Sequence, residues 1–188
     1  MATRSASRRR ETPTGREEVA AAVLEAASDL FAERGPAATS IRDIAARSKV
    51  NHGLVFRHFG TKEQLVGTVL DHLSMTTINL RVAGAPEAEL LRAADRHMRV
   101  IARTLLDGYP VGKLQTQFPG MSLLLDAVRP RHPDDRSARL AVANAAALQF
   151  GWRLFEPFLR ASTGLDELTD AELRQAVAVE LGRIVEPH

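Results

Sequence analysis

Cysteine is absent from this chain of 188 residues, and aromatic residues make up only 5% of it. Without cysteine there is no disulfide framework, no Cys-ligated metal site and no thiol nucleophile. Residues 140–152 are the longest stretch without a charged side chain, far short of the roughly 20 apolar residues that span a bilayer. The arginines near the N-terminus are not followed by an apolar segment, so no secretory signal is expected. We therefore expect a cytoplasmic protein without a membrane partner.

Catalytic signatures are missing as well. The sequence contains no G-x-S-x-G, G-x-G-x-x-G, Walker A or H-E-x-x-H motif. Its histidines His72, His97 and His132 are scattered and lack metal-ligand spacing. We therefore expect no enzyme, no metal site and no cofactor.

Hydrophobic residues make up 45% of the chain and charged residues 26%, a balance typical of globular proteins. Much of the apolar fraction is alanine and leucine, which favours helices and predicts an all-α fold. Four capping boxes mark helix starts: Thr14 with Glu17, Ser40 with Asp43, Thr61 with Gln64, and Thr169 with Glu172. Pro86 and Pro133 are each expected at a first helical position. The expected helices cover about 14–34, 40–48, 51–59, 61–81, 86–107, two short segments within 111–130, 133–160 and 169–185.

Positive charge is concentrated in the first third of the chain. Residues 1–62 hold 11 Lys and Arg against 7 Asp and Glu, whereas residues 63–188 hold 14 against 16. A cationic excess at one end is a weak pointer to nucleic acid, because neutralising phosphates supplies non-specific affinity. A basic tail on an otherwise neutral protein explains the same counts equally well.

The segment from Ser40 to Leu65 has the spacing of a helix-turn-helix, in which the second short helix lies in a major groove. At about 100° per residue, Val55 and Phe59 fall on the inner side of that helix. Gly53, Leu54, Phe56 and Arg57 are then expected to face outward. Glycine permits close approach to the duplex, apolar side chains contact the thymine methyl group, and arginine pairs with guanine or phosphate.

Residues 14–65 resemble the DNA-binding domain of the TetR family of bacterial transcriptional regulators. The resemblance is carried by Gly35, Thr39–Ala45, Val50, Val55–Phe59 and Lys62–Leu65. It implies that Ser40 and Lys62 bind phosphates, that Arg42 reaches a base edge, and that the outward face of residues 51–57 enters the groove. Phe56 stands where the family usually has tyrosine. Lys49 stands where it usually has glycine, and a left-handed backbone there would cost about 1–2 kcal/mol.

The predictions for DNA binding and domain organisation combine the spacing with the resemblance. The predicted DNA contacts are Ser40, Arg42, Lys49, Asn51, His52, Gly53, Leu54, Phe56, Arg57, His58 and Lys62. Residues 1–13 are predicted to be a flexible basic arm, 14–62 the helix-turn-helix domain, and 63–188 a helical domain for effector binding and dimerisation. Arg4, Arg8, Arg9 and Arg10 in the arm either contact DNA or belong to an idle tail.

The C-terminal part has a candidate effector pocket and more apolar helix surface than one small domain can hide. The residues predicted to line the pocket are His97, Met98, Ile101, Leu105, Tyr109, Phe118, Met121, Leu125, Phe150 and Trp152. Plain core packing is an equally open interpretation of these residues. The combined prediction is a homodimeric repressor that binds a palindromic operator on double-stranded DNA and is released by a small molecule. An all-helical enzyme with a vestigial DNA-binding motif and a protein-interaction module remain alternatives.

Overall fold

The computed structural model describes residues 15–187, and every regular element within that range is helical, as predicted. The predicted arm, residues 1–13, lies outside the described residues. The elements are α1 (Arg16–Arg34), α2 (Ile41–Ser48), α3 (His52–Phe59), α4 (Lys62–Val82), α5 (Glu87–Leu106), α6 (Val111–Leu114), α7 (Pro119–Val128), a 3-10 turn (Arg129–Arg131), α8 (Asp135–Thr163) and α9 (Asp170–Ile184).

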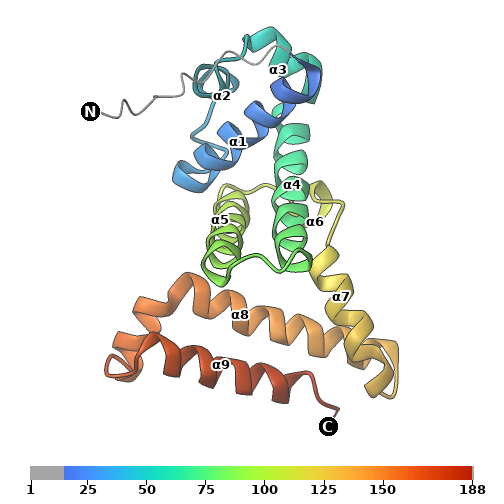
Figure 1. Ribbon diagram of the computed structural model, residues 1–188, viewed down its shortest axis with the longest axis vertical. Coiled ribbons are helices and arrows are strands. Elements are labelled where there is room, and N and C mark those ends of the chain that lie inside the picture. Colours follow the sequence, from blue (N-terminus) through green and yellow to red (C-terminus); the bar gives the residue numbers. More distant parts are fainter. Residues whose placement is uncertain (1–14, 188) are drawn as a thin grey trace, which may run out of the picture.

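The helices are arranged along one long axis (Figure 1). Helices α1, α2 and α3 gather at one end, and α4 runs from that end into the middle of the molecule beside α5. Helices α8 and α9 lie side by side across the opposite end, and α7 connects them to the middle. The helix-turn-helix segment is therefore farthest from the C-terminal helix pair.

Three of the four predicted capping boxes are confirmed. The backbone N–H groups of Asp43, Gln64 and Glu172 donate to the side-chain oxygens of Ser40, Thr61 and Thr169 at 3.1, 3.2 and 3.3 Å. These bonds satisfy N–H groups that the first helical turn leaves without partners.

Three predicted helix starts need correction. Helix α1 begins one residue late: Gly15 is its N-cap, and the Glu18 carboxylate accepts from Gly15 N–H at 3.4 Å. Pro86 is the N-cap of α5 instead of its first helical residue. Helix α8 starts beyond Pro133, because the Asp134 carboxylate accepts from Ser137 N–H at 2.8 Å. Proline has no side-chain acceptor for that bond.

The main hydrophobic core joins the first three helices to the middle of the molecule. Phe31, Ile44, Val55, Leu65 and Val100 are fully buried in one cluster that draws on each of α1 to α5. The buried packing therefore continues across residue 62, the place where the sequence predicts a domain boundary. A second cluster lies between α7 and α8 and consists of Val128, Ala138, Ala141 and Val142.

Helices α4 and α6 approach each other closely at one glycine. A Cβ added at Gly67 would lie 2.5 Å from the carbonyl oxygen of Leu114, which is closer than two such atoms can approach. One turn further along α4, Asp71 Oδ1 accepts from the backbone N–H groups of Thr116 and Gln117, both at 2.8 Å. The loop after α6 is thus fastened directly to α4.

Lys49 is the only non-glycine residue with a positive φ among residues 15–187, at φ 58° and ψ 29°. It ends α2 in the left-handed conformation expected from the sequence. Glycine adopts this conformation without a Cβ penalty.

We predict that Lys49→Gly raises the free energy of unfolding by about 1 kcal/mol, measured by chemical denaturation. Lys49→Ala keeps the Cβ and serves as the control. Equal stability of both variants would contradict a strained turn.

Candidate nucleic-acid interface

Helices α2 and α3 are kept short by local signals at both ends of α3. The Asn51 side chain caps α3 and accepts from Gly53 N–H at 2.8 Å. At the other end Gly60 has φ 68° and ψ −128°, a conformation in which a residue with a Cβ is strained. Glycine therefore suits the position where α3 ends at Phe59, and Thr61 caps α4 immediately afterwards.

The outward face of α3 is mostly as predicted. Val55 is fully buried and Phe59 is half-buried against the main core. Gly53 and Arg57 are exposed, and Phe56 is 61% exposed. Leu54 is a correction: it is half-buried and packs against the main core, because the N-terminal part of α1 lies beside this edge of α3. The apolar surface that α3 presents is therefore mainly Phe56.

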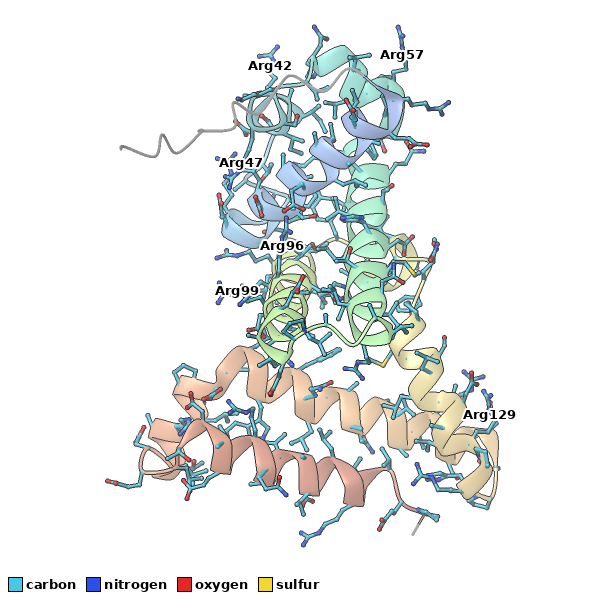
Figure 2. The ribbon with its side chains drawn as sticks, viewed as in Figure 1. Arg42, Arg47, Arg57, Arg96, Arg99 and Arg129 are labelled. Atoms are coloured by element: carbon cyan, nitrogen blue, oxygen red, sulfur yellow. The ribbon has the colours of Figure 1, made fainter. Side chains whose placement is uncertain are left out.

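Two arginines on α2 and α3 are without an acidic partner among the described residues. Arg42 on α2 and Arg57 on α3 both point away from the body (Figure 2), and neither forms an ion pair with any residue from 15 to 187. Arg47, also on α2, lies instead against α1, where its guanidinium donates to Glu33 at 2.7 and 3.0 Å. Arg42 and Arg57 thus remain available on the surface that α2 and α3 share.

Ser40 is exposed at the start of α2, but its hydroxyl is already bonded. It donates to Asp43 Oδ2 at 2.8 Å, and the same carboxylate oxygen lies 2.9 Å from the Arg34 guanidinium. The backbone and hydroxyl hydrogen bonds from Ser40, followed by Arg34, lower the pKa of Asp43. A phosphate at this helix end therefore competes with the ionised Asp43 carboxylate for the Ser40 hydroxyl. The sequence prediction used Ser40 both as a helix cap and as a phosphate contact and did not include this competition.

Lys62, the first residue of α4, is half-buried rather than free. Burial lowers the pKa of its ammonium group, and attraction to Asp107 and Asp43 opposes that shift. Asp107 ends α5, 45 residues further along the chain, so no local pattern in the sequence pairs it with Lys62. The lysine therefore lies near two acids while it occupies the position predicted to clamp a phosphate.

The remaining predicted contacts surround α3. Lys49, Asn51 and His52 are exposed in the turn and at the helix start. His58 is half-buried beside Phe59, with 6.2 Å between the ring centroids. A shallow depression next to α3 is lined by Arg16, Val19, Leu54, Arg57 and His58. Arg16 adds a positive charge beside α3 and was not among the predicted DNA contacts. Its position near the start of the predicted first helix was the only sign of this in the sequence.

The predicted effector residues do not gather in one place. Leu105 and Phe118 are 55% and 42% exposed, because α5 and α7 turn these side chains outward. Met121 and Leu125 pack on the α7–α8 cluster, whereas Ile101 and Tyr109 pack on the main core. Phe150 and Trp152 are half-buried on α8, and Met98 is buried on α5. Their role as an effector set stays a prediction.

His97 differs from the other members of this set because its Nε2 atom is buried without a hydrogen-bond partner among the described residues. Burial lowers the pKa of its imidazole to about 4. The side chain is therefore neutral near pH 7 and retains an unused hydrogen-bonding position inside the molecule.

Taken together, α2, the left-handed turn at Lys49 and the exposed face of α3 define a helix-turn-helix DNA-binding protein. A family model described as "Bacterial regulatory proteins, tetR family" matches residues 23–69. The HTH-type transcriptional repressor Rv3405c of Mycobacterium tuberculosis is 69% identical over the full length of both chains, as is the HTH-type transcriptional regulator Mb3439c of Mycobacterium bovis. The chain belongs to the TetR family and is a DNA-binding transcriptional regulator, as the resemblance implied.

Solved structures share the fold at low sequence identity. A tetR family transcription regulator from Shewanella sp. PV-4 superposes with a TM-score of 0.58 at 18% identity, covering 87% of this chain and 95% of the other. A mutant of the HlyIIR protein gives 0.55 at 20% identity, covering 91% and 97%. The enzyme and interaction-module alternatives are not favoured by any of these relatives. Within residues 15–187, no helix has the length and apolar character needed to cross a bilayer.

The buried His97 predicts a pH-dependent stability. Its pKa is about 4 in the folded protein and about 6.5 when exposed, so between these values the unfolded chain binds more protons. Stability is therefore fully present above pH 6.5 and is lost as the pH falls toward 4. We expect about 1–2 kcal/mol less stability at pH 5 than at pH 7 from this group alone.

Thermal unfolding of the wild type and His97→Leu from pH 7 to pH 5 measures this contribution. The variant is expected to lose less stability over the range. His52→Leu, which removes an exposed histidine, is the control. Parallel pH profiles for the wild type and His97→Leu would contradict the prediction.

Proposed function

We propose that this regulator binds a palindromic operator as a homodimer and represses transcription until a small-molecule effector releases it. The observation that carries the DNA-binding part is the pair of unpaired arginines, Arg42 and Arg57, beside the exposed face of α3 (Figure 2). A side chain with no internal partner loses no ion pair when it contacts DNA. The energetic cost of moving these two cations onto a duplex is therefore small.

Each exposed residue type on α3 suits one kind of DNA contact. Arg57 offers paired N–H donors for guanine or phosphate, and the Phe56 ring is available for a thymine methyl group. Gly53 exposes backbone on the same face, and a Cβ there would meet only Asn51 Oδ1, at 3.2 Å. We infer that α3 enters the major groove with Gly53 closest to the bases, while Arg42 and Lys49 flank it.

The homodimer is supported by an apolar stripe on α8. Leu140, Phe155 and Phe158 are 54%, 56% and 68% exposed, and Ala143 and Ala147 are exposed between them. At 100° per residue all five lie within about 60° of one line along the helix. Such a stripe at the end opposite α3 suits a two-fold pairing of α8 and α9 with a second copy. That symmetry would place two α3 helices on one duplex and require a palindrome.

The effector part is supported by unused polar atoms on α5. Thr104 Oγ1 and His97 Nε2 are both buried without a hydrogen-bond partner among the described residues, and they stand two helical turns apart. An unsatisfied buried polar atom is costly, so a ligand that bonds it is stabilised. A neutral, amphipathic effector with hydrogen-bonding oxygen atoms fits these groups. Such an effector causes release of DNA only to the extent that it binds the DNA-free conformation of the protein more tightly than the DNA-bound one.

The DNA-binding proposal is tested by selecting duplexes from a random pool with the full chain and measuring affinities over a range of salt concentrations. Arg57→Ala is expected to weaken binding to the selected duplex by about 1–3 kcal/mol and relax its sequence preference. Lys62→Ala is expected to weaken binding to all duplexes and reduce the salt slope by about 1.

Arg99→Ala is the matched control, because Arg99 is an exposed arginine on α5, away from α3, and has no ion pair with residues 15–187 (Figure 2). Its affinity for the selected duplex is expected to equal that of the wild type. Unchanged affinity in both Arg57→Ala and Lys62→Ala, or selected sequences without two-fold symmetry, would contradict the proposed mode of binding.

The dimer prediction is tested separately by sedimentation. Phe155→Glu with Phe158→Glu places two carboxylates on the apolar stripe and is expected to yield monomers at concentrations where the wild type is a dimer. Leu106→Glu, on a side chain that is 87% exposed at the last residue of α5, is the control. A double variant that still sediments as a dimer would place the contact elsewhere.

A further inference from the structure

One face of α5 is fastened to α1 by charged and polar side chains. Arg96 donates to Glu25 Oε1 at 2.9 Å and to the Glu25 carbonyl oxygen at 3.0 Å, and it lies 2.8 Å from Asp29 Oδ1. One turn beyond the fully buried Val100, Arg103 Nε donates to the carbonyl oxygen of Ala32 at 3.0 Å. Figure 2 shows Arg96 at the place where the two helices meet.

The same face ends at Asp107, which holds the turn that leads into α2. Asp107 Oδ2 accepts a hydrogen bond from Ala37 N–H at 2.6 Å. The carboxylate also lies against Gly35, where a Cβ would approach Asp107 Oδ2 to 2.5 Å. Residues 96, 100, 103 and 107 are spaced at i, i+4, i+7 and i+11, so all four follow one line along α5.

The other end of α2 is connected to α5 as well, through α1. Arg47, in the last turn of α2, lies 3.5 Å from Asp29 and 2.7 Å from Glu33. Asp29 thus stands between Arg47 of α2 and Arg96 of α5. Helix α2 is fixed at its start by the turn that Asp107 holds, and near its end by this chain of ion pairs.

The opposite side of α5 carries predicted effector residues. Met98, Ile101 and Leu105 lie about 140–200° from Arg96 around the helix at 100° per residue. His97 and Thr104, whose buried polar atoms support the effector part of the proposed function, lie about 100° and 80° from Arg96. Helix α5 therefore carries predicted effector residues as well as the residues that hold the helix-turn-helix. A small rotation or shift of α5 would act directly on the turn before α2.

We propose that Asp107 is a positioning residue for operator binding, and that α5 transmits effector binding to α2 and α3 through the Asp107–Ala37 hydrogen bond and the Arg96–Asp29–Arg47 ion pairs. This inference rests on the proposed function, because it assigns the route by which that function is regulated. Asp107 does not touch DNA. It sets the fraction of molecules whose helix-turn-helix has the orientation that the operator requires.

A positioning role and a purely electrostatic role predict opposite changes in DNA affinity when the Asp107 carboxylate is removed. If the carboxylate acted only through its charge, Asp107→Ala would tighten binding to every duplex, because one repulsive charge is gone. If it positions the turn, Asp107→Ala weakens binding to the selected duplex alone. A drop of the competent fraction to about a tenth would raise the apparent Kd about tenfold.

The test measures the affinity of full-length variants for the duplex selected by the wild type and for a scrambled duplex of equal length. Asp107→Ala is expected to bind the selected duplex about tenfold more weakly with an unchanged salt slope, and the scrambled duplex no more weakly. Asp107→Asn retains an acceptor for Ala37 N–H and is expected to stay within about twofold of the wild type. Asp126→Ala removes the same charge from an exposed site on α7 and is the matched control.

A second measurement follows the orientation without DNA. Because the chain has no cysteine, spin labels are placed at Ala46→Cys on α2 and Arg92→Cys on α5, both exposed, in protomers diluted with unlabelled protein. The distance distribution between the labels is expected to broaden in Asp107→Ala and to remain narrow in Asp107→Asn. Thermal unfolding of each variant identifies a general loss of fold.

The outcomes separate this inference from the proposed function. If the wild type prefers no duplex, the proposed function fails, and the label distances alone decide whether Asp107 positions α2. If the wild type selects a duplex and Asp107→Ala binds it equally or more tightly, the positioning role is overturned. It is also overturned if both Asp107 variants weaken binding to both duplexes alike, or if the distance distribution does not change.

Discussion

The burial of Val55 is the constraint on which the proposed DNA-binding surface depends. Val55 points from α3 into a core that also contains Phe31, Ile44 and Val100, and all four are fully buried. Burying one such side chain contributes about 1.5–3 kcal/mol, so α3 cannot rotate about its axis without losing a substantial part of the stability of this small unit. With Val55 fixed inward, helical geometry directs Gly53 and Arg57 outward. The same core includes α4 and α5, so the helix-turn-helix is held by the middle of the molecule.

An apolar core resists separation of the helices but is not directional, and the polar contacts at its edge supply the direction. Arg96 bonds to Glu25 and Asp29 of α1, Arg103 to the carbonyl oxygen of Ala32, and Asp107 to Ala37 N–H in the following turn. Exposed ion pairs are individually worth about 1 kcal/mol or less, and single hydrogen bonds about 0.5–1.5 kcal/mol. Contacts of that size suit the regulatory role proposed for α5, because allosteric coupling energies are commonly about 1–3 kcal/mol. Much stronger contacts would hold one orientation of the helix-turn-helix regardless of the proposed effector.

Short-range patterns made most of the fold predictable from the sequence. The boxes at Ser40, Thr61 and Thr169 placed three helix starts, and helical geometry at about 100° per residue placed Val55 inside and Arg57 outside. Three helix starts were wrong by one or two residues, and the errors in side-chain burial arose where a contact comes from a distant segment. Leu54 is half-buried because α1 lies beside it, and Lys62 lies near Asp107 of α5. Neither neighbour is visible in a window of a few residues. The predicted effector residues were also grouped without knowledge of distant contacts. They are mostly hydrophobic, but some pack on the main core and others on the α7–α8 cluster.

The arrangement of charge matters more than its amount in this protein. Residues 15–62 hold seven Lys and Arg against six Asp and Glu, so the cationic excess of the first third of the chain comes mostly from its first 14 residues. What distinguishes the folded helix-turn-helix is the separation of signs. Glu25, Asp29 and Glu33 of α1 face Arg47 and Arg96, whereas Arg42 and Arg57 have no acidic partner within the described residues. Several opposite charges are thus paired where α1 meets α2 and α5, while Arg42 and Arg57 keep uncompensated positive charge on the surface that α2 and α3 share. Because the potential at a surface depends on local uncompensated charge, these two arginines favour the approach of phosphate to that surface, which supports the proposed function.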